Sequence, residues 1–339
     1  MKSILELINE LPEFKWDYYY GIDSSRTIDN PFVKKNYHNS FIRNYFKRGG
    51  KTDVFKTSGI KISQIRYPNH INSVFFLGIL LYNNTSFNKL YKLEKNEPGY
   101  QTFPFIWFLI ALFHDNAYNI ELSNLFKYIT SLDELLRHYK IENFLFDVKS
   151  SSKCNILIDL RNDYFSYRLN EMHKVDHGLL GGILLYDRLL KIRREAKKYH
   201  EDDLFWGEEL EGQYQIAAEA ISIHNIWLPN SKATEDLYQK YNLNNLINFR
   251  KVRFKDFPLF YILGIIDTIE PIKTYQDDAD DQYILNNIQL KFKSKSLTFY
   301  HRPGSRLDFN KLKQKTKYFE GWLDVDVKMN TDHFELIFK

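Results

Sequence analysis

The chain contains a single cysteine, Cys154, among its 339 residues. One cysteine allows no disulfide within the chain, and it excludes zinc sites that are built from several thiolates. The scarcity of cysteine therefore favours a reducing compartment. Any metal site would have to use histidine and carboxylate ligands.

Long hydrophobic runs are also missing. The longest ones, Val74 to Leu81 and Phe103 to Phe113, fall well short of the ~20 apolar residues that span a bilayer. The first residues, MKSILELINELPEF, place acidic residues among the apolar ones and lack the apolar core of a signal peptide. We therefore expect a cytoplasmic protein that has no membrane partner.

A strong excess of charge is absent as well, because 47 basic and 43 acidic residues leave a formal net charge of +4. Long nucleic acids are usually bound through basic clusters that release counterions, so this near balance argues against a nucleic-acid partner. It does permit a small anionic substrate. The chain also has no Gly-rich phosphate loop of the Walker type, which argues against work driven by nucleoside triphosphates.

Apolar residues recur at helical spacing along most of the chain, and this pattern predicts a mainly α fold. We expect one helix to start at Pro68-Asn69, with Asn69 as its N-cap, and another to start at His177, capped by Asp176. The interpretation divides the chain into a mixed N-terminal segment, 1–66, a helical domain, 67–282, with an insertion at about 121–170, and a C-terminal appendage, 283–339.

The appendage has a different pattern, since its apolar and polar residues alternate. Residues 323–329 and 334–338 flank the turn Asn330-Thr-Asp, which predicts a β-hairpin. Residues 296–300 are a candidate for a further strand. The predicted fold class is therefore a helical bundle with a small β-hairpin appendage.

Six histidine and aspartate residues near the ends of apolar stretches form the most informative pattern: His70, His114, Asp115, His177, His224 and Asp267. A lone histidine in a helix is more often a hydrogen-bonded structural residue than a ligand. Several such groups in one core, however, are costly to bury unless a cation satisfies them. Imidazole and carboxylate suit Fe, Mn and Zn, and carboxylate also suits Mg. The sequence therefore predicts a helical metalloenzyme.

The pattern leaves open whether one divalent ion binds or two. Four of these residues, His70, His114, Asp115 and Asp267, suffice for one ion with open positions for water. His177 and His224 would supply a second ion, with Asp115 as the bridge, and two-ion sites stabilise both the attacking and the leaving oxygens of a phosphoryl group.

This order of ligands resembles the HD-domain superfamily of metal-dependent phosphohydrolases. The segment IIDTIEPIK resembles the final motif of bacterial HD enzymes that hydrolyse dinucleoside tetraphosphates symmetrically. DHGLLGGILLYDRL resembles the His-x-x-x-Gly helix of the six-ligand members, and LFHDNAY resembles their HD-x-(small)-Tyr step. The resemblance covers about residues 66–275, and the longer segment 116–176 and the C-terminal hairpin depart from it.

The resemblance implies an HD-type helical bundle with two ions. One ion would be held by His70, His114, Asp115 and Asp267, and the other by Asp115, His177 and His224. It also implies hydrolysis of a phosphoester or phosphoanhydride bond of a small nucleotide by a hydroxide that bridges the ions, so that Asp115 is essential for catalysis.

Further residues near these motifs are candidates for substrate binding and proton transfer. Arg66, Lys174 and Lys273 could neutralise phosphate oxygens, although for the first two the solvated surface charge is the favoured interpretation. His173 is a candidate acid for the leaving group, or a surface histidine. Glu270 either orients a metal ligand or pairs with Lys273.

Two other classes of function share the same residues. Some six-ligand HD proteins hold a di-iron centre and use dioxygen, and this ligand set does not distinguish them from hydrolases. A non-catalytic sensor or scaffold could keep the metal site for stability. The aromatic N-terminal segment and the hairpin are candidates for the interface of a homo-oligomer.

The role of Lys174 is open to a kinetic test. If its ammonium contacts a substrate phosphate, Lys174→Ala should mainly raise KM and change kcat little. The measurement is the dependence of rate on substrate concentration, and an unaltered profile would return Lys174 to the solvated surface.

Overall fold

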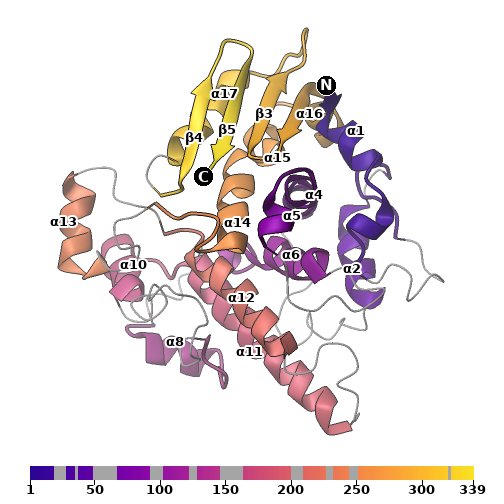
Figure 1. The fold of residues 1–339 in the computed structure, drawn as a ribbon. Helices are drawn as coiled ribbons and strands as arrows, with labels where there is room; N and C mark the ends of the chain where they lie inside the picture. The colour runs from indigo at the N-terminus through magenta and orange to yellow at the C-terminus, as the bar shows by residue number, and fades with distance from the viewer. Residues whose placement is uncertain are drawn as a thin grey trace.

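The structure is a computed structural model, and it describes residues 1–18, 28–34, 37–48, 67–91, 102–121, 128–145, 163–199, 209–226, 232–243, 251–319 and 322–339. These residues form a mainly α-helical fold with one small antiparallel sheet (Figure 1). The mainly α class predicted from the sequence is therefore confirmed. None of the helices in these ranges is both long enough and apolar enough to cross a membrane.

The elements follow one another from the N-terminus. The first are β1 (Lys2–Ser3), α1 (Ile4–Asn9), α2 (His38–Arg48), α4 (Pro68–Asn84), α5 (Phe87–Leu90), α6 (Thr102–Phe113), α7 (Tyr118–Glu121) and α8 (Leu132–His138). Then come α10 (Phe165–Met172), α11 (His177–Tyr199), α12 (Glu209–Ile223), α13 (Lys232–Lys240), α14 (Pro258–Ile269) and α15 (Pro271–Tyr275). The last are α16 (Asp281–Asn287), β2 (Ile288–Lys293), β3 (Ser296–His301), α17 (Phe309–Lys315), β4 (Val325–Met329) and β5 (His333–Phe338).

Four helices form a closed ring of contacts in the middle of the molecule. Helix α4 packs on α6, α6 on α12, α12 on α14, and α14 on α4 again. Helix α6 is buried along its whole length, as expected for a helix that is apolar on every face. Helix α11 runs beside α12 at the end of the molecule opposite the sheet (Figure 1). The ring brings distant parts of the sequence together at one point.

The first residues of α11 and α4 show whether the predicted N-caps are present. Asp176 does cap α11, because its Oδ1 accepts a hydrogen bond of 2.9 Å from the backbone N–H of Leu179. The prediction for Asn69 was wrong: Pro68 occupies the first turn of α4, so the N-cap is Tyr67. Asn69 therefore lies inside the helix, where its side-chain amide donates to Asp281 at 3.1 Å.

The sheet has five strands in the order β1-β2-β3-β5-β4, and all of its neighbours are antiparallel. The predicted hairpin is confirmed as β4 and β5, and the further strand as β3. Two strands were missed. β2 follows directly from α16, which spans the boundary predicted near residue 283, and β1 comes from the opposite end of the chain, where Lys2 lies opposite Leu290.

Helices α11 and α12 approach closely because glycine lies between them. A Cβ atom at Gly182 would lie 2.5 Å from the backbone oxygen of Ala218 and 2.0 Å from Oγ of Ser222. A Cβ atom at Gly178 would lie 2.7 Å from the His224 ring and 2.8 Å from the backbone oxygen of Ile221. Both positions therefore require glycine for close contact, and Gly178 does so directly beside a predicted ligand.

This close contact predicts a stability effect. Gly182→Ala should lower the free energy of unfolding by about 1–3 kcal/mol, because the backbone of α12 cannot move away from the new methyl group without loss of packing. Gly212 is a matched control in α12: it is exposed, and a Cβ atom there would have no neighbour within 4 Å. Gly212→Ala should stabilise the protein by up to about 1 kcal/mol. Chemical denaturation measures both changes, and equal effects would contradict the packing argument.

Candidate metal centre

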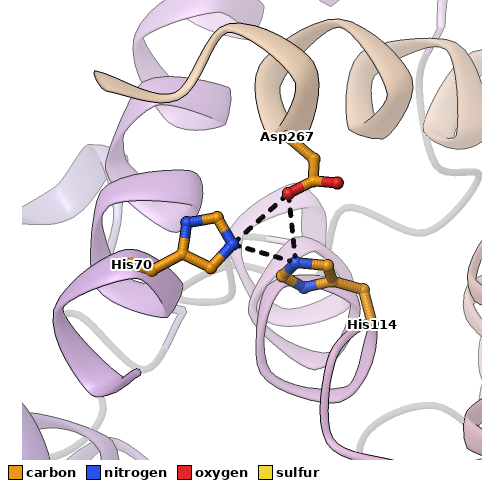
Figure 2. Close-up of side chains that lie close together, drawn as sticks. All are labelled: His70, His114 and Asp267. Atoms are coloured by element: carbon orange, nitrogen blue, oxygen red, sulfur yellow. Dashed lines mark hydrogen bonds and ion pairs between the residues drawn. The ribbon is translucent and has the colours of Figure 1, made fainter. Parts of the chain in front are cut away.

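The ring of helices brings three predicted ligands to one point. His70 lies in the first turn of α4, His114 directly follows α6, and Asp267 lies in the last turn of α14. Figure 2 shows the two imidazoles pointing toward the carboxylate. Nε2 of His70 lies 3.3 Å from Nε2 of His114 and 3.3 Å from Oδ1 of Asp267, and Nε2 of His114 lies 3.5 Å from the same oxygen.

These separations fit the ligands of a metal ion. Bonds from a metal to nitrogen or oxygen are about 2.0–2.2 Å long, so neighbouring ligand atoms around one ion lie about 3.0–3.5 Å apart. Two imidazole nitrogens that face each other without a proton between them are unfavourable unless they share a cation. The donor set and its spacing therefore fit a divalent ion.

The same two histidines are held so that Nε2 faces the site. Nδ1 of His70 lies 3.0 Å from Oε2 of Glu270, and Nδ1 of His114 lies 2.8 Å from the backbone oxygen of Ala111. An Nδ1–H that donates to oxygen leaves the Nε2 lone pair free for a metal. Glu270 thus orients the ring of His70, a candidate ligand, in line with one of the two roles predicted for it.

A second group consists of Asp115, His177 and His224, whose potential ligand atoms lie within 4.8 Å of one another. Nε2 of His177 lies 3.5 Å from Oδ1 of Asp115. Nδ1 of His177 bonds the carboxylate of Glu121, and Nδ1 of His224 lies 2.7 Å from the backbone oxygen of Ile221. The ring of His224 leaves Nε2 for the site. Nε2 of His177 faces Asp115, although the side-chain amide of Asn225 also lies 3.0 Å from it. This group too could hold a metal ion.

Asp115 connects the two groups. Its Oδ2 lies 3.6 Å from Nε2 of His70 and 3.6 Å from Nε2 of His114, while its Oδ1 faces His177. The carboxylate therefore has one oxygen toward each group. This is the arrangement of a ligand that bridges two ions.

The charges of the site are strongly coupled. Burial raises the pKa of Asp115 and of Asp267, but the neighbouring cations outweigh it and hold the pKa of both carboxyls well below their usual range. The ammonium of Lys273 contributes to both shifts, since it lies 3.5 Å from Asp115 and 3.3 Å from Asp267. Both carboxylates are therefore ionised and ready to bind a cation.

The two histidines of the second group differ in charge. Burial lowers the pKa of His177, but its contacts with Asp115 and Glu121 raise this pKa to about 10. Burial and the nearby His177 lower the pKa of His224 to about 4. His224 is thus neutral at physiological pH, whereas His177 has to lose a proton before it can bind a metal.

The remaining predicted residues lie in different places. Lys273 contacts both carboxylates and has a side chain that is 46% exposed. His173 and Lys174 are exposed in the turn between α10 and α11, where the described structure gives neither side chain a contact with the six ligands. Arg66 lies outside the described residues. The roles predicted for these last three residues therefore remain predictions.

Sequence reasoning missed two residues that contact His177. Glu121 bonds its Nδ1 atom, and the side-chain amide of Asn225 lies 3.0 Å from its Nε2 atom. Glu121 lies at the start of the predicted insertion and is not among the predicted site residues. No local signal identified it, because its partner His177 lies 56 residues later in the chain.

No protein-family model, curated protein or solved structure matches the chain. The interpretation of the site consequently depends on its own geometry.

The second group can be tested by removing one ligand. His224→Ala should lower the metal content from two equivalents per chain toward one, because the first group keeps its ligands. His138→Ala is a suitable control, since this histidine is exposed on α8 and is not one of the six candidate ligands. Elemental analysis of protein purified without added metal gives the content, and an unchanged value for His224→Ala would remove this residue from the ligand set.

Proposed function

We propose that the chain is a metal-dependent phosphohydrolase that cleaves a phosphoester or phosphoanhydride bond of a small nucleotide. The observation that carries this proposal is the Asp115 carboxylate, which has one oxygen toward each of two groups of potential ligands. The resemblance of the motifs to the HD-domain superfamily supports the same reaction class and an HD-type helical bundle.

Two divalent ions, one held by His70, His114 and Asp267 and the other by Asp115, His177 and His224, would activate water at neutral pH and stabilise the charge of a phosphoryl group. The protein has to keep the ligands ready for them. Asp115 and Asp267 remain ionised, and Glu270 and Glu121 hold the rings of His70 and His177 in orientation. The helices thus fix the ligands before a substrate arrives, which is the condition for electrostatic catalysis.

Lys273 is the cation best placed for substrate. Its ammonium lies beside both ligand carboxylates, and its side chain is half exposed. A phosphoryl oxygen that approaches the site from solvent would meet this charge. In the proposal Lys273 neutralises a non-bridging oxygen, while His173, Lys174 and Arg66 remain candidates for more distant contacts with the substrate or the leaving group.

The substrate class follows from charge and resemblance. A net charge of +4 over 339 residues suits a small anion better than a long nucleic acid. Dinucleoside polyphosphates, mononucleotides, deoxynucleoside triphosphates and cyclic nucleotides all carry the required phosphoryl group. We also propose a cytoplasmic location. We propose in addition that the chain forms a homo-oligomer, which light scattering would test.

The decisive variant is Asp115→Ala. It should abolish phosphohydrolase activity and lower the metal content, because both ions lose a shared ligand, while the fold stays largely intact. The measurement combines phosphate release from a panel of small nucleotides with elemental analysis and circular dichroism. Asp236→Ala, at an exposed position of α13, is the control and should retain full activity.

The outcomes separate the three classes of function. Full activity of Asp115→Ala would refute the proposed role of the bridge. Strict dependence on iron together with substrate-dependent oxygen uptake would favour the oxygenase. Two bound ions without turnover on the panel and without oxygen uptake would favour the non-catalytic sensor.

A further inference from the structure

A buried cluster of three charged residues and one tyrosine lies directly behind the second group of ligands. It consists of Glu121 at the end of α7, Asp176 at the start of α11, and Arg168 and Tyr164 from the region of α10. None of the four belongs to the six potential ligands. Helix α10 is part of the segment predicted to be an insertion, so this segment reaches the metal centre.

Arg168 joins the two acidic residues of this cluster. Its Nη2 atom lies 2.9 Å from Oε1 of Glu121 and 3.2 Å from Oδ2 of Asp176. Both carboxylates are buried, and Asp176 is fully so. Two buried carboxylates this close to one another would repel without a cation, so Arg168 is required to keep both of them in place.

Each of these carboxylates in turn holds a residue of the second group. Glu121 accepts hydrogen bonds from Nδ1 and from the backbone N–H of His177. Asp176 caps α11, whose first residue is His177, and it lies 3.4 Å from the amide of Asn225, the residue that follows His224. The guanidinium therefore acts on His177 through two residues that it contacts itself. Its link to His224 is longer and runs through Asp176 and Asn225.

The first group of potential ligands, His70, His114 and Asp267, does not depend on Arg168. Its orienting acid, Glu270, accepts backbone N–H groups of Ile272 at 2.9 Å and Lys273 at 2.6 Å, in addition to His70 and the hydroxyl of Ser73. These partners belong to α15 and α4, in and beside the ring of helices. The two groups are thus supported by different parts of the chain.

We propose that Arg168 is a positioning residue that sets the affinity of the second metal ion, so that helix α10 controls whether the site holds one ion or two. This inference rests on the proposed function only in that divalent ions bind to the two groups. It requires no particular substrate. A two-ion site with separately supported halves can be loaded in steps, the first ion at His70, His114 and Asp267 and the second ion at His177 and His224.

The test is a calorimetric titration of the metal-free full chain with Mn²⁺. In Arg168→Met the second ion should bind about 10- to 100-fold more weakly, the usual cost of losing a group that orients a metal ligand. The first ion should bind as in the unaltered protein. A variant that merely loosened the fold would weaken both ions together, so the difference between the two affinities distinguishes positioning from a general structural role.

Lys240→Ala provides a control from α13, because it removes a different ion pair to α10. The ammonium of Lys240 lies 2.7 Å from Glu171 of α10, but this ion pair is exposed and involves none of the six potential ligands. The control should retain both affinities. Arg168→Lys keeps the charge but lacks the fork that reaches two carboxylates, so its second affinity should lie between those of the unaltered protein and Arg168→Met.

The outcomes are distinct. Equal affinities for the second ion in Arg168→Met and the unaltered protein, or equal losses at both ions, would overturn the inference and leave the proposed function standing. If Arg168→Met does not fold, Arg168→Lys decides: weaker binding of the second ion alone supports the inference, and unaltered binding overturns it. An unaltered protein that binds no Mn²⁺ would refute the proposed function as well as the inference.

Discussion

The structure depends on one electrostatic constraint: four buried imidazoles and two partly buried carboxylates meet between helices, where leaving them unpaired is costly. The contacts within the protein satisfy only part of this requirement. Each ring has a partner for Nδ1, but the Nε2 atoms of His70 and His114 face each other at 3.3 Å. Asp115 carries its charge at the point where both groups meet. The packing of the four helices therefore fits a role in positioning ligands for cations.

Two kinds of hydrogen bond from Nδ1 orient the four histidines, and each kind occurs twice. His114 and His224 each follow the end of a helix, and each places Nδ1 against the backbone oxygen three residues earlier, Ala111 and Ile221. His70 and His177 each stand in the first turn of a helix and place Nδ1 against a buried glutamate, Glu270 and Glu121. Helix ends can hold a ring rigidly because their unpaired backbone groups are available. One ring of each kind belongs to each group of ligands.

Much of the fold and of the site could be predicted from the sequence, because the necessary signals are local. Helical periodicity gives α4, α6, α11, α12 and α14, and an imidazole or carboxylate at the end of such a stripe marks a candidate ligand. What failed depends on partners that are far away in the chain. Strand β1 is too short to show a pattern, and the role of Glu121 depends on Arg168 and His177. The error at Asn69 has a local cause instead, because Pro68 takes the first helical position and Tyr67 is the N-cap.

The pairing of β1 with β2 has a consequence for the order of folding. Lys2 and Ser3 pair with Leu290 and Gln289, which are synthesised more than two hundred residues later. The sheet therefore closes only after most of the described chain has emerged, and contacts of such high sequence separation fold slowly. Helix α14, which carries Asp267, is also made late. During translation the histidine-bearing helices can pack against one another, but the candidate metal centre gains its second carboxylate only after all four histidines have been made.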